Sequence, residues 1–146
     1  MMKVFKSVLP TGLWGVLMAI MLLLPSCAEH PYQQGQILYE NFCSSCHMSD
    51  GSGLEGVIPP LAGADYWRDN QASLACLIRY GITDTIIVNG KTYNNPMAGI
   101  PNLTEFEIAN IINYVNQAWG HELAVVRVSD LQKQLDECLP DYYPKK

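Results

Sequence analysis

Cys43-Ser44-Ser45-Cys46-His47 is the stretch that decides the fold of this 146-residue chain. It reads C-x-x-C-H, the attachment pattern of a c-type haem. Two thiols three positions apart can each form a thioether with one haem vinyl group, and the adjacent histidine can donate a ring nitrogen to the iron. The C-x-x-C part alone would also suit a redox dithiol or half of a zinc site. The immediate histidine and the single copy favour one covalent haem c, above all in an exported protein.

The N-terminus has the pattern of an export signal. Lys3 and Lys6 precede an uncharged apolar run from Leu13 to Leu24. Twelve helical residues span about 18 Å, whereas the hydrocarbon core of a bilayer is about 30 Å thick. We therefore expect residues 1–26 to be a signal peptide. Extending the apolar run back to Val8 leaves a transmembrane anchor as the alternative.

The end of this run is similar to a bacterial lipobox. Leu24 stands at −3, Pro25 at −2 and Ser26 at −1 relative to Cys27, with proline a departure from the usual small residue. We expect Cys27 to be acylated and to anchor the chain to a bacterial membrane facing the periplasm, followed by a tether over residues 27–33. More than one acyl chain gives stable anchoring. The alternative is an ordinary signal peptide followed by an unmodified thiol.

The net charge of the chain indicates which classes of partner it can bind. The formal net charge is −5 over the whole sequence, and removing residues 1–26 with their two lysines makes it −7. An acidic protein is a poor ligand for nucleic acid. It suits a redox partner with a basic docking patch, where charge mainly speeds encounter. Solubility alone is the alternative explanation.

The cysteine count predicts one crosslink. Of five cysteines, Cys27 is assigned to lipid and Cys43 and Cys46 to haem, which leaves Cys76 and Cys138. Two thiols left over in an oxidising compartment predict a disulfide. It would tie the C-terminal extension to the haem domain and contribute about 2–4 kcal/mol. Two separately buried free cysteines are the alternative.

Periodicity and turn signals predict a mainly helical domain. We expect helices over about 32–46, 70–80, 104–119 and 129–137, with Asn70, Thr104 and Ser129 as N-caps, a β-hairpin near 86–93, and a loop over 94–101. An apolar stripe of Ile37, Leu38 and Phe42 is expected on the first helix. Thr104 and Glu107 form a capping box, and Asn89-Gly90 is a strong hairpin signal. Gly35, costly inside a helix by about 1 kcal/mol relative to Ala, predicts the close approach of another helix.

A haem bound through His47 needs a ligand on its other face. Met48 is adjacent to His47 and cannot reach around the ring, and His30 and His121 are expected on the surface. Met97 is the remaining thioether, and the two prolines on either side would restrict its movement. The alternative is that Met97 is a loop or core methionine and not an iron ligand. The Ile58–Leu61 segment could place a backbone carbonyl against the Nδ1–H of His47, or it could be only a stiff loop.

Taken together, these motifs resemble the class I cytochromes c over about residues 32–120. The resemblance implies an all-α class I cytochrome c fold around one haem, with a domain at 34–120 and an extension at 121–146 packed back on it. It assigns the carbonyl contact of His47 to Pro59, the distal ligand to Met97, and the aromatic partner of Gly35 to Tyr114. The hairpin and the cysteine-bearing tail depart from the core family and are similar to membrane-attached bacterial cytochrome subunits.

The sequence predicts a lipid-anchored electron carrier without catalytic residues. It would pass single electrons on the periplasmic side of a respiratory chain, from a quinol-oxidising complex to a terminal oxidase or reductase. His/Met ligation raises the potential and leaves no open coordination position. The alternative is a haem-based gas sensor in which Met97 dissociates. A peroxidase-like enzyme is disfavoured because no distal acid–base group accompanies the motif.

Overall fold

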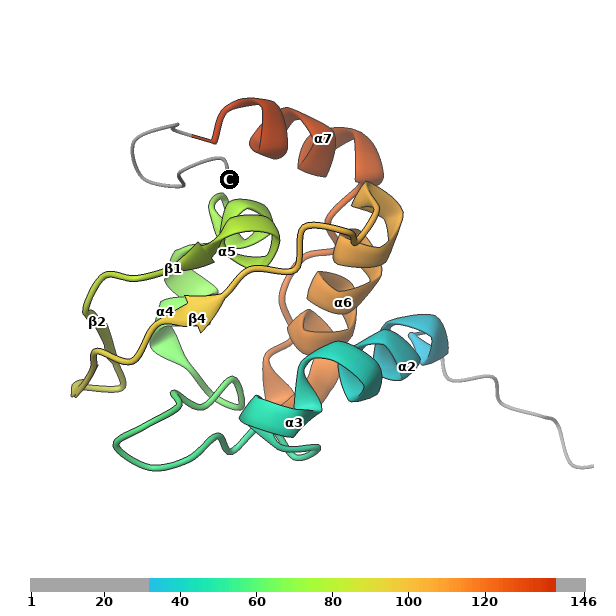
Figure 1. Cartoon of the computed structure of the whole chain (residues 1–146). Helices are drawn as coiled ribbons and strands as arrows, with labels where there is room; N and C mark the ends of the chain where they lie inside the picture. The colour runs from blue at the N-terminus through green and yellow to red at the C-terminus, as the bar shows by residue number, and fades with distance from the viewer. Residues whose placement is uncertain (1–31, 139–146) are drawn as a thin grey trace, which may run out of the picture. The chain divides into compact units, whose positions relative to one another are not determined.

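Helix α2, the first helix of the described chain, and helix α6 cross at the centre of the fold (Figure 1). The computed structural model describes residues 32–138. The predicted signal peptide, Cys27, His30 and residues 139–146 lie outside the described residues. The helices are α2 Gln33–Phe42, α3 Ser44–His47, α4 Asp65–Asp69, α5 Leu74–Tyr80, α6 Glu105–Gln117 and α7 Val128–Asp136, with a 3₁₀ turn η1 at Ala118–Gly120.

Gly35 allows the crossing of α2 and α6. A Cβ atom built at Gly35 would collide with the backbone carbonyl of Asn110 and lie 2.7 Å from the Cβ of Tyr114. The predicted close approach of a second helix is therefore confirmed. The face that α2 buries differs from the expected stripe: Gly35, Leu38 and Tyr39 are buried, whereas Ile37 is 48% exposed. The crossing decides this face, because only the side with the glycine can approach α6.

Helix α6 begins and ends for identifiable reasons. The Thr104 side chain accepts from the backbone N–H of Glu107, whose carboxylate accepts from the Thr104 N–H, so the capping box is confirmed. The helix ends at Gln117, two residues before the expected end, and the chain continues through η1. Ala118 has an extended backbone, with φ −79° and ψ 155°, and this ends the helical path; Trp119 follows in the left-handed region with a φ of 52°.

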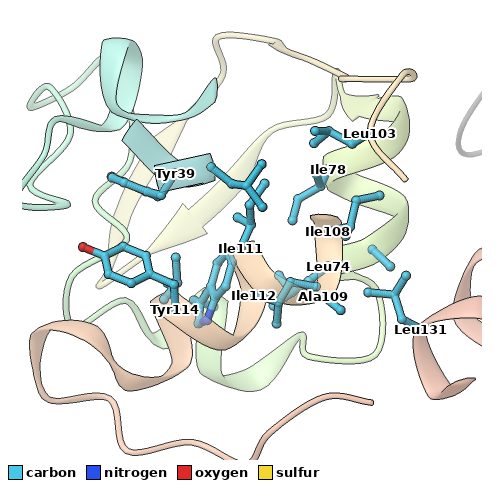
Figure 2. Packing of buried hydrophobic residues seen from close by; sticks show 14 of the residues in the cluster. Tyr39, Leu74, Ile78, Leu103, Ile108, Ala109, Ile111, Ile112, Tyr114 and Leu131 are labelled. Atoms are coloured by element: carbon cyan, nitrogen blue, oxygen red, sulfur yellow. The ribbon is translucent and has the colours of Figure 1, made fainter. Parts of the chain in front are cut away.

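The core lies between α2, α5 and α6. Figure 2 shows its buried side chains, drawn from these helices and from the extension. Leu74 and Ile78 contribute from α5, Ile108 and Ile112 from α6, and Leu131 from α7. Leu131 is fully buried. The C-terminal extension therefore belongs to the core as far as the structure describes it.

Four short strands make two antiparallel pairs. Strand β2 (Ile86–Val88) pairs with β3 (Lys91–Tyr93), which confirms the predicted hairpin. Asn89 and Gly90 both have positive φ at its turn, as a type I′ hairpin requires. Strand β1 (Gly81–Ile82) pairs with β4 (Met97–Ala98).

The second pair corrects the prediction of a plain loop over 94–101. Pro96 and Pro101 lie outside β4, so the short stretch between them keeps its backbone N–H groups for pairing. The register places Ile82 opposite Met97 and Gly81 opposite Ala98. The result is that Met97 sits on a paired strand, which fixes its backbone more firmly than a loop would.

Two predicted helix starts are also wrong. Helix α5 begins at Leu74, and Asn70 instead ends the unpredicted α4 by donating from its side chain to the carbonyl of Tyr66 at 2.8 Å. Helix α7 starts at Val128 after Arg127, so Ser129 is not its cap. No helix within residues 32–138 has the length and hydrophobicity needed to span a bilayer.

The extension is crosslinked to α5. Cys76 and Cys138 form the predicted disulfide, with their Cα atoms 5.8 Å apart. Cys76 is buried on α5, and Cys138 follows the end of α7. The disulfide therefore holds α7 against the helix that it packs on.

Candidate haem-binding site

The attachment residues share a single helical turn. Cys43 lies between α2 and α3, and its carbonyl accepts from the N–H of His47 at 2.9 Å and of Cys46 at 3.1 Å. Residues three and four apart in a helix lie on the same face. Cys43, Cys46 and His47 accordingly line the same cavity, which has a volume of about 480 Å³.

The cavity suits a large apolar cofactor. Its size lies within the range of about 300–1,000 Å³ that is usual for ligand pockets. Its walls are mainly apolar, with Phe42, Ile58, Leu77 and Val88 among them, and Met97 also lines it. Two thiols, an imidazole and a thioether thus face one apolar cavity. This set of donors fits a covalently attached haem.

His47 is prepared to bind a metal through one nitrogen. Its Nδ1 lies 3.0 Å from the carbonyl oxygen of Pro59. Because a carbonyl oxygen can only accept, Nδ1 carries the proton, and Nε2 is left with the lone pair. Burial lowers the pKa of His47, and the hydrogen bond to Pro59 only partly opposes that effect. The ring is therefore neutral near pH 7, as a ligand must be.

The strand that carries Met97 is braced on several sides. Ile82 pairs with Met97, and the N–H of Ile100 donates to the carbonyl of Ile78 at 2.9 Å. Asn95 donates from its side chain to the carbonyl of Val57 at 3.1 Å. The backbone of Gly99 lies so close to the end of α5 that a Cβ there would meet the carbonyl oxygen of Arg79 at 2.6 Å.

The two other uses of C-x-x-C find little support. Burial raises the pKa of the Cys43 thiol to about 12, whereas a redox-active thiol needs a lowered pKa. Among residues 32–138 no three histidine, cysteine, aspartate or glutamate side chains are grouped to hold a metal ion. A second half of a zinc site is therefore not found in the described part of the chain.

Two residues near the site differ from expectation. His121, expected on the surface, is half-buried and its Nε2 lies 2.7 Å from the carbonyl oxygen of Leu61. Trp67 lines the cavity from α4, a helix that was not predicted. Its indole N–H donates to Oδ1 of the buried Asn116 at 2.8 Å. Only five residues long, α4 lacks the repeated apolar spacing that identifies longer helices.

The fold and the site define a c-type haem protein. The family described as Cytochrome c matches residues 32–119. The chain belongs to the cytochrome c family. Its haem c is covalently bound, and it is an electron-transfer protein.

The relatives fall into two groups. Cytochrome c-552 of Thermus thermophilus is 35% identical over 82 residues, covering 53% of this chain and 63% of that protein. The cytochrome c subunit of alcohol dehydrogenase (quinone) from Gluconobacter oxydans is 34% identical over 104 residues, 68% of this chain but 21% of that protein. The fructose dehydrogenase cytochrome subunit of Gluconobacter japonicus is 35% identical over 106 residues, again 21% of its length. The chain thus spans under two thirds of the length of each.

Proposed function

We propose that this protein is a lipid-anchored carrier of single electrons, with His47 and Met97 as the axial ligands of one haem. The observation that carries the proposal is that both residues line the same mainly apolar cavity as the two attachment cysteines. His47 and Met97 are 50 positions apart in the sequence. Their meeting at one cavity is a product of the fold.

His47 and Met97 would hold a haem that, when bound, would supply a one-electron ferric–ferrous couple, and a thioether ligand would raise its potential. The chain's own residues hold that couple in place. Pro59 fixes the orientation of the His47 ring, and the pairing of β4 with β1 holds Met97. The mainly apolar wall would limit the access of water to a bound haem, which suits electron transfer without bond making.

The bracing of Met97 favours an electron carrier over a gas sensor. A sensor needs a ligand that leaves readily, whereas a carrier needs the same geometry in both oxidation states. Met97 lies on a paired strand, and a hydrogen bond from Ile100 to α5 follows directly after it. These contacts fix the backbone that carries the Met97 side chain, which favours the same ligand position in both oxidation states.

We further propose that the carrier works at a bacterial cell-envelope membrane on its periplasmic side. Cys27, outside the described residues, would carry the lipid after removal of residues 1–26, and residues 27–33 would be the tether to a haem domain at 34–120. The donor would be a quinol-oxidising complex and the acceptor a terminal oxidase or reductase with a basic docking patch. Similarity to cytochrome subunits of two dehydrogenases supports an oxidoreductase as partner, and the net charge of −5 supports the basic patch.

A redox titration of matched methionine variants tests the axial pair. Met97→Leu keeps the volume and removes the sulfur, so the midpoint potential should fall and the reduced protein should bind carbon monoxide. Met48→Leu is the control, because Met48 follows His47 directly and lies outside the cavity lining. Equal potentials for wild type and Met97→Leu would contradict the assignment of Met97.

The anchor is tested separately by fractionation. Wild-type protein expressed in a bacterium that processes lipoproteins should be found in the membrane fraction, labelled by a fatty acid. Cys27→Ser should appear in the soluble periplasmic fraction with its haem spectrum unchanged. A Cys27→Ser variant that stays in the membrane would contradict lipid anchoring and would favour a transmembrane segment.

A further inference from the structure

The turn that follows α6 packs against the loop that carries Pro59. Trp119 contacts this loop at Gly51, where an added Cβ would lie 2.7 Å from the indole ring. His121 contacts the same loop at Leu61, with 2.7 Å between its Nε2 and the carbonyl oxygen. Two residues of one short turn thus hold two points of the loop at 51–61.

These two points are joined to each other. The N–H of Leu61 donates to the carbonyl of Gly51 at 2.8 Å, and that of Ala62 donates to the same oxygen at 3.0 Å. Gly53 donates to the carbonyl of His47 at 3.0 Å. The loop is therefore held by hydrogen bonds within itself and to the attachment turn. It also contacts the turn at 118–121.

The backbone of Trp119 is strained in a way that fits this role. Its φ of 52° lies in the left-handed region, where a bulky residue costs of order 1 kcal/mol or more. Its ring packs edge-on against Tyr39 and Tyr114, with centroids 5.3 and 5.8 Å away. Tight aromatic packing offsets the strain and leaves the following His121 aimed at the loop.

From this arrangement we infer that His121 is a positioning residue for His47. The hydrogen bond to Leu61 holds the chain two residues after Pro59, whose carbonyl accepts the Nδ1–H of His47. Because a carbonyl can only accept, Nε2 of His121 is the donor. Loss of this donor removes one of the contacts that hold Pro59 against the His47 ring.

This positioning would change the midpoint potential of a haem iron bound by His47. The inference therefore rests on the proposed function. A hydrogen bond from Nδ1–H to a carbonyl makes the imidazole a more basic ligand. A more basic ligand stabilises the ferric state over the ferrous state. Weakening the contact between His47 and Pro59 should thus raise the midpoint potential, whereas general loosening that admits water should lower it.

The test compares three variants of the full haem-bearing protein. His121→Ala removes the donor, and His121→Gln keeps an N–H at a similar reach. Asn113→Ala is the matched control, because Asn113 holds the same C-terminal segment through two hydrogen bonds to Val126 and does not contact the loop. The measurements are the midpoint potential and, in the reduced protein, the exchange rate of the His47 Nδ1–H by NMR.

We expect His121→Ala to favour reduction about threefold, an upward shift of roughly 30 mV for a one-electron couple at 59 mV per tenfold change. Exchange of the His47 ring proton should become about tenfold faster. His121→Gln and Asn113→Ala should match the wild type in both. If His121→Ala fails to take up haem, His121→Asn replaces it, because the shorter side chain does not reach Leu61.

An unchanged potential and exchange rate in His121→Ala would overturn the inference, and so would a downward shift or a failure of His121→Gln to restore the wild-type values. The sulfur-to-iron charge-transfer band of the oxidised wild type separates these outcomes from failure of the proposed function. A protein that shows the band but no effect of His121 has the proposed axial pair without this positioning residue.

Discussion

The backbone of Gly35 lies directly against the carbonyl oxygen of Asn110, at the point where α2 crosses α6. The Cβ of Tyr114 is also close, at 2.7 Å from where a side chain at residue 35 would begin. Both neighbours belong to the backbone or the root of a side chain and cannot rotate away. The contact between the two helices therefore requires glycine.

We predict that Gly35→Ala destabilises the protein although alanine is the better helix former. Propensity alone favours alanine by about 1 kcal/mol, whereas forcing an extra methyl group into a packed contact costs about 1–3 kcal/mol and occasionally more. The net loss should be about 1–2 kcal/mol or more in the free energy of unfolding, measured with guanidinium chloride. Gln36→Ala, one position along on the exposed face of α2, should be neutral or stabilising. A stabilising Gly35→Ala would show that the helices separate more readily than the structure indicates.

The disulfide between Cys76 and Cys138 should make a large contribution to stability. The two cysteines are 62 positions apart, and closing so long a loop restricts the unfolded chain by about 2–4 kcal/mol. Cys138→Ser should lower the free energy of unfolding by this amount while the visible haem spectrum stays unchanged. In the wild type, thiol labelling of the unfolded, haem-bearing protein should detect no free thiol at Cys76 or Cys138. Two labelled thiols would refute the crosslink.

Acid should weaken the link between α4 and the β-hairpin. The Asp65 carboxylate accepts from the backbone N–H of Asn89 at 2.7 Å, and the backbone N–H of Asp65 donates to Oδ1 of Asn89 at 3.0 Å. The bond from Asn89 is the main reason that the pKa of Asp65 lies below its ordinary value of 3.8. A lowered pKa in the folded state stabilises the fold above that value, and the contribution is lost as the pH falls through the lower folded pKa.

Asp65→Asn should therefore be less stable than wild type near pH 6 and should lose less stability on acidification to about pH 3. Unfolding by denaturant at both pH values measures the difference. Asp69→Asn is the control, because Asp69 is on the surface and its ion pair with Arg68 is exposed. If Asp65→Asn and the wild type lose the same stability between these two pH values, the charge of the Asp65 carboxylate does not stabilise the fold.

The sequence predicted the structure most accurately where a short local motif has one usual structural role. Cys43, Cys46 and His47 reach the same cavity because adjacent helical spacing places them there, whatever the rest of the fold. Gly35 and the Thr104 capping box also followed from local rules. The attachment motif and the capping box need no knowledge of distant partners, and the glycine indicates that a partner helix exists without identifying it.

Three features that depend on distant partners were missed, although the disulfide between Cys76 and Cys138 was predicted across 62 positions. Strand β4 exists because β1, from the other side of the hairpin, pairs with it, and two prolines nearby had indicated a loop. His121 has no local pattern that sets it apart from a surface histidine, and its contact with Leu61 depends on the turn at Trp119. Helix α4 is too short for periodicity to reveal. In each case the tertiary contact, and not the local sequence, determines the outcome.

The most direct test of the account is the long-wavelength absorption spectrum of the oxidised, haem-bearing protein. Ligation by Met97 predicts a sulfur-to-iron charge-transfer band that is lost in Met97→Leu and kept in Met48→Leu, and a reduced wild-type protein that does not bind carbon monoxide. Absence of the band in the wild type, together with ready binding of carbon monoxide, would contradict the His47–Met97 axial pair and favour a gas-binding protein.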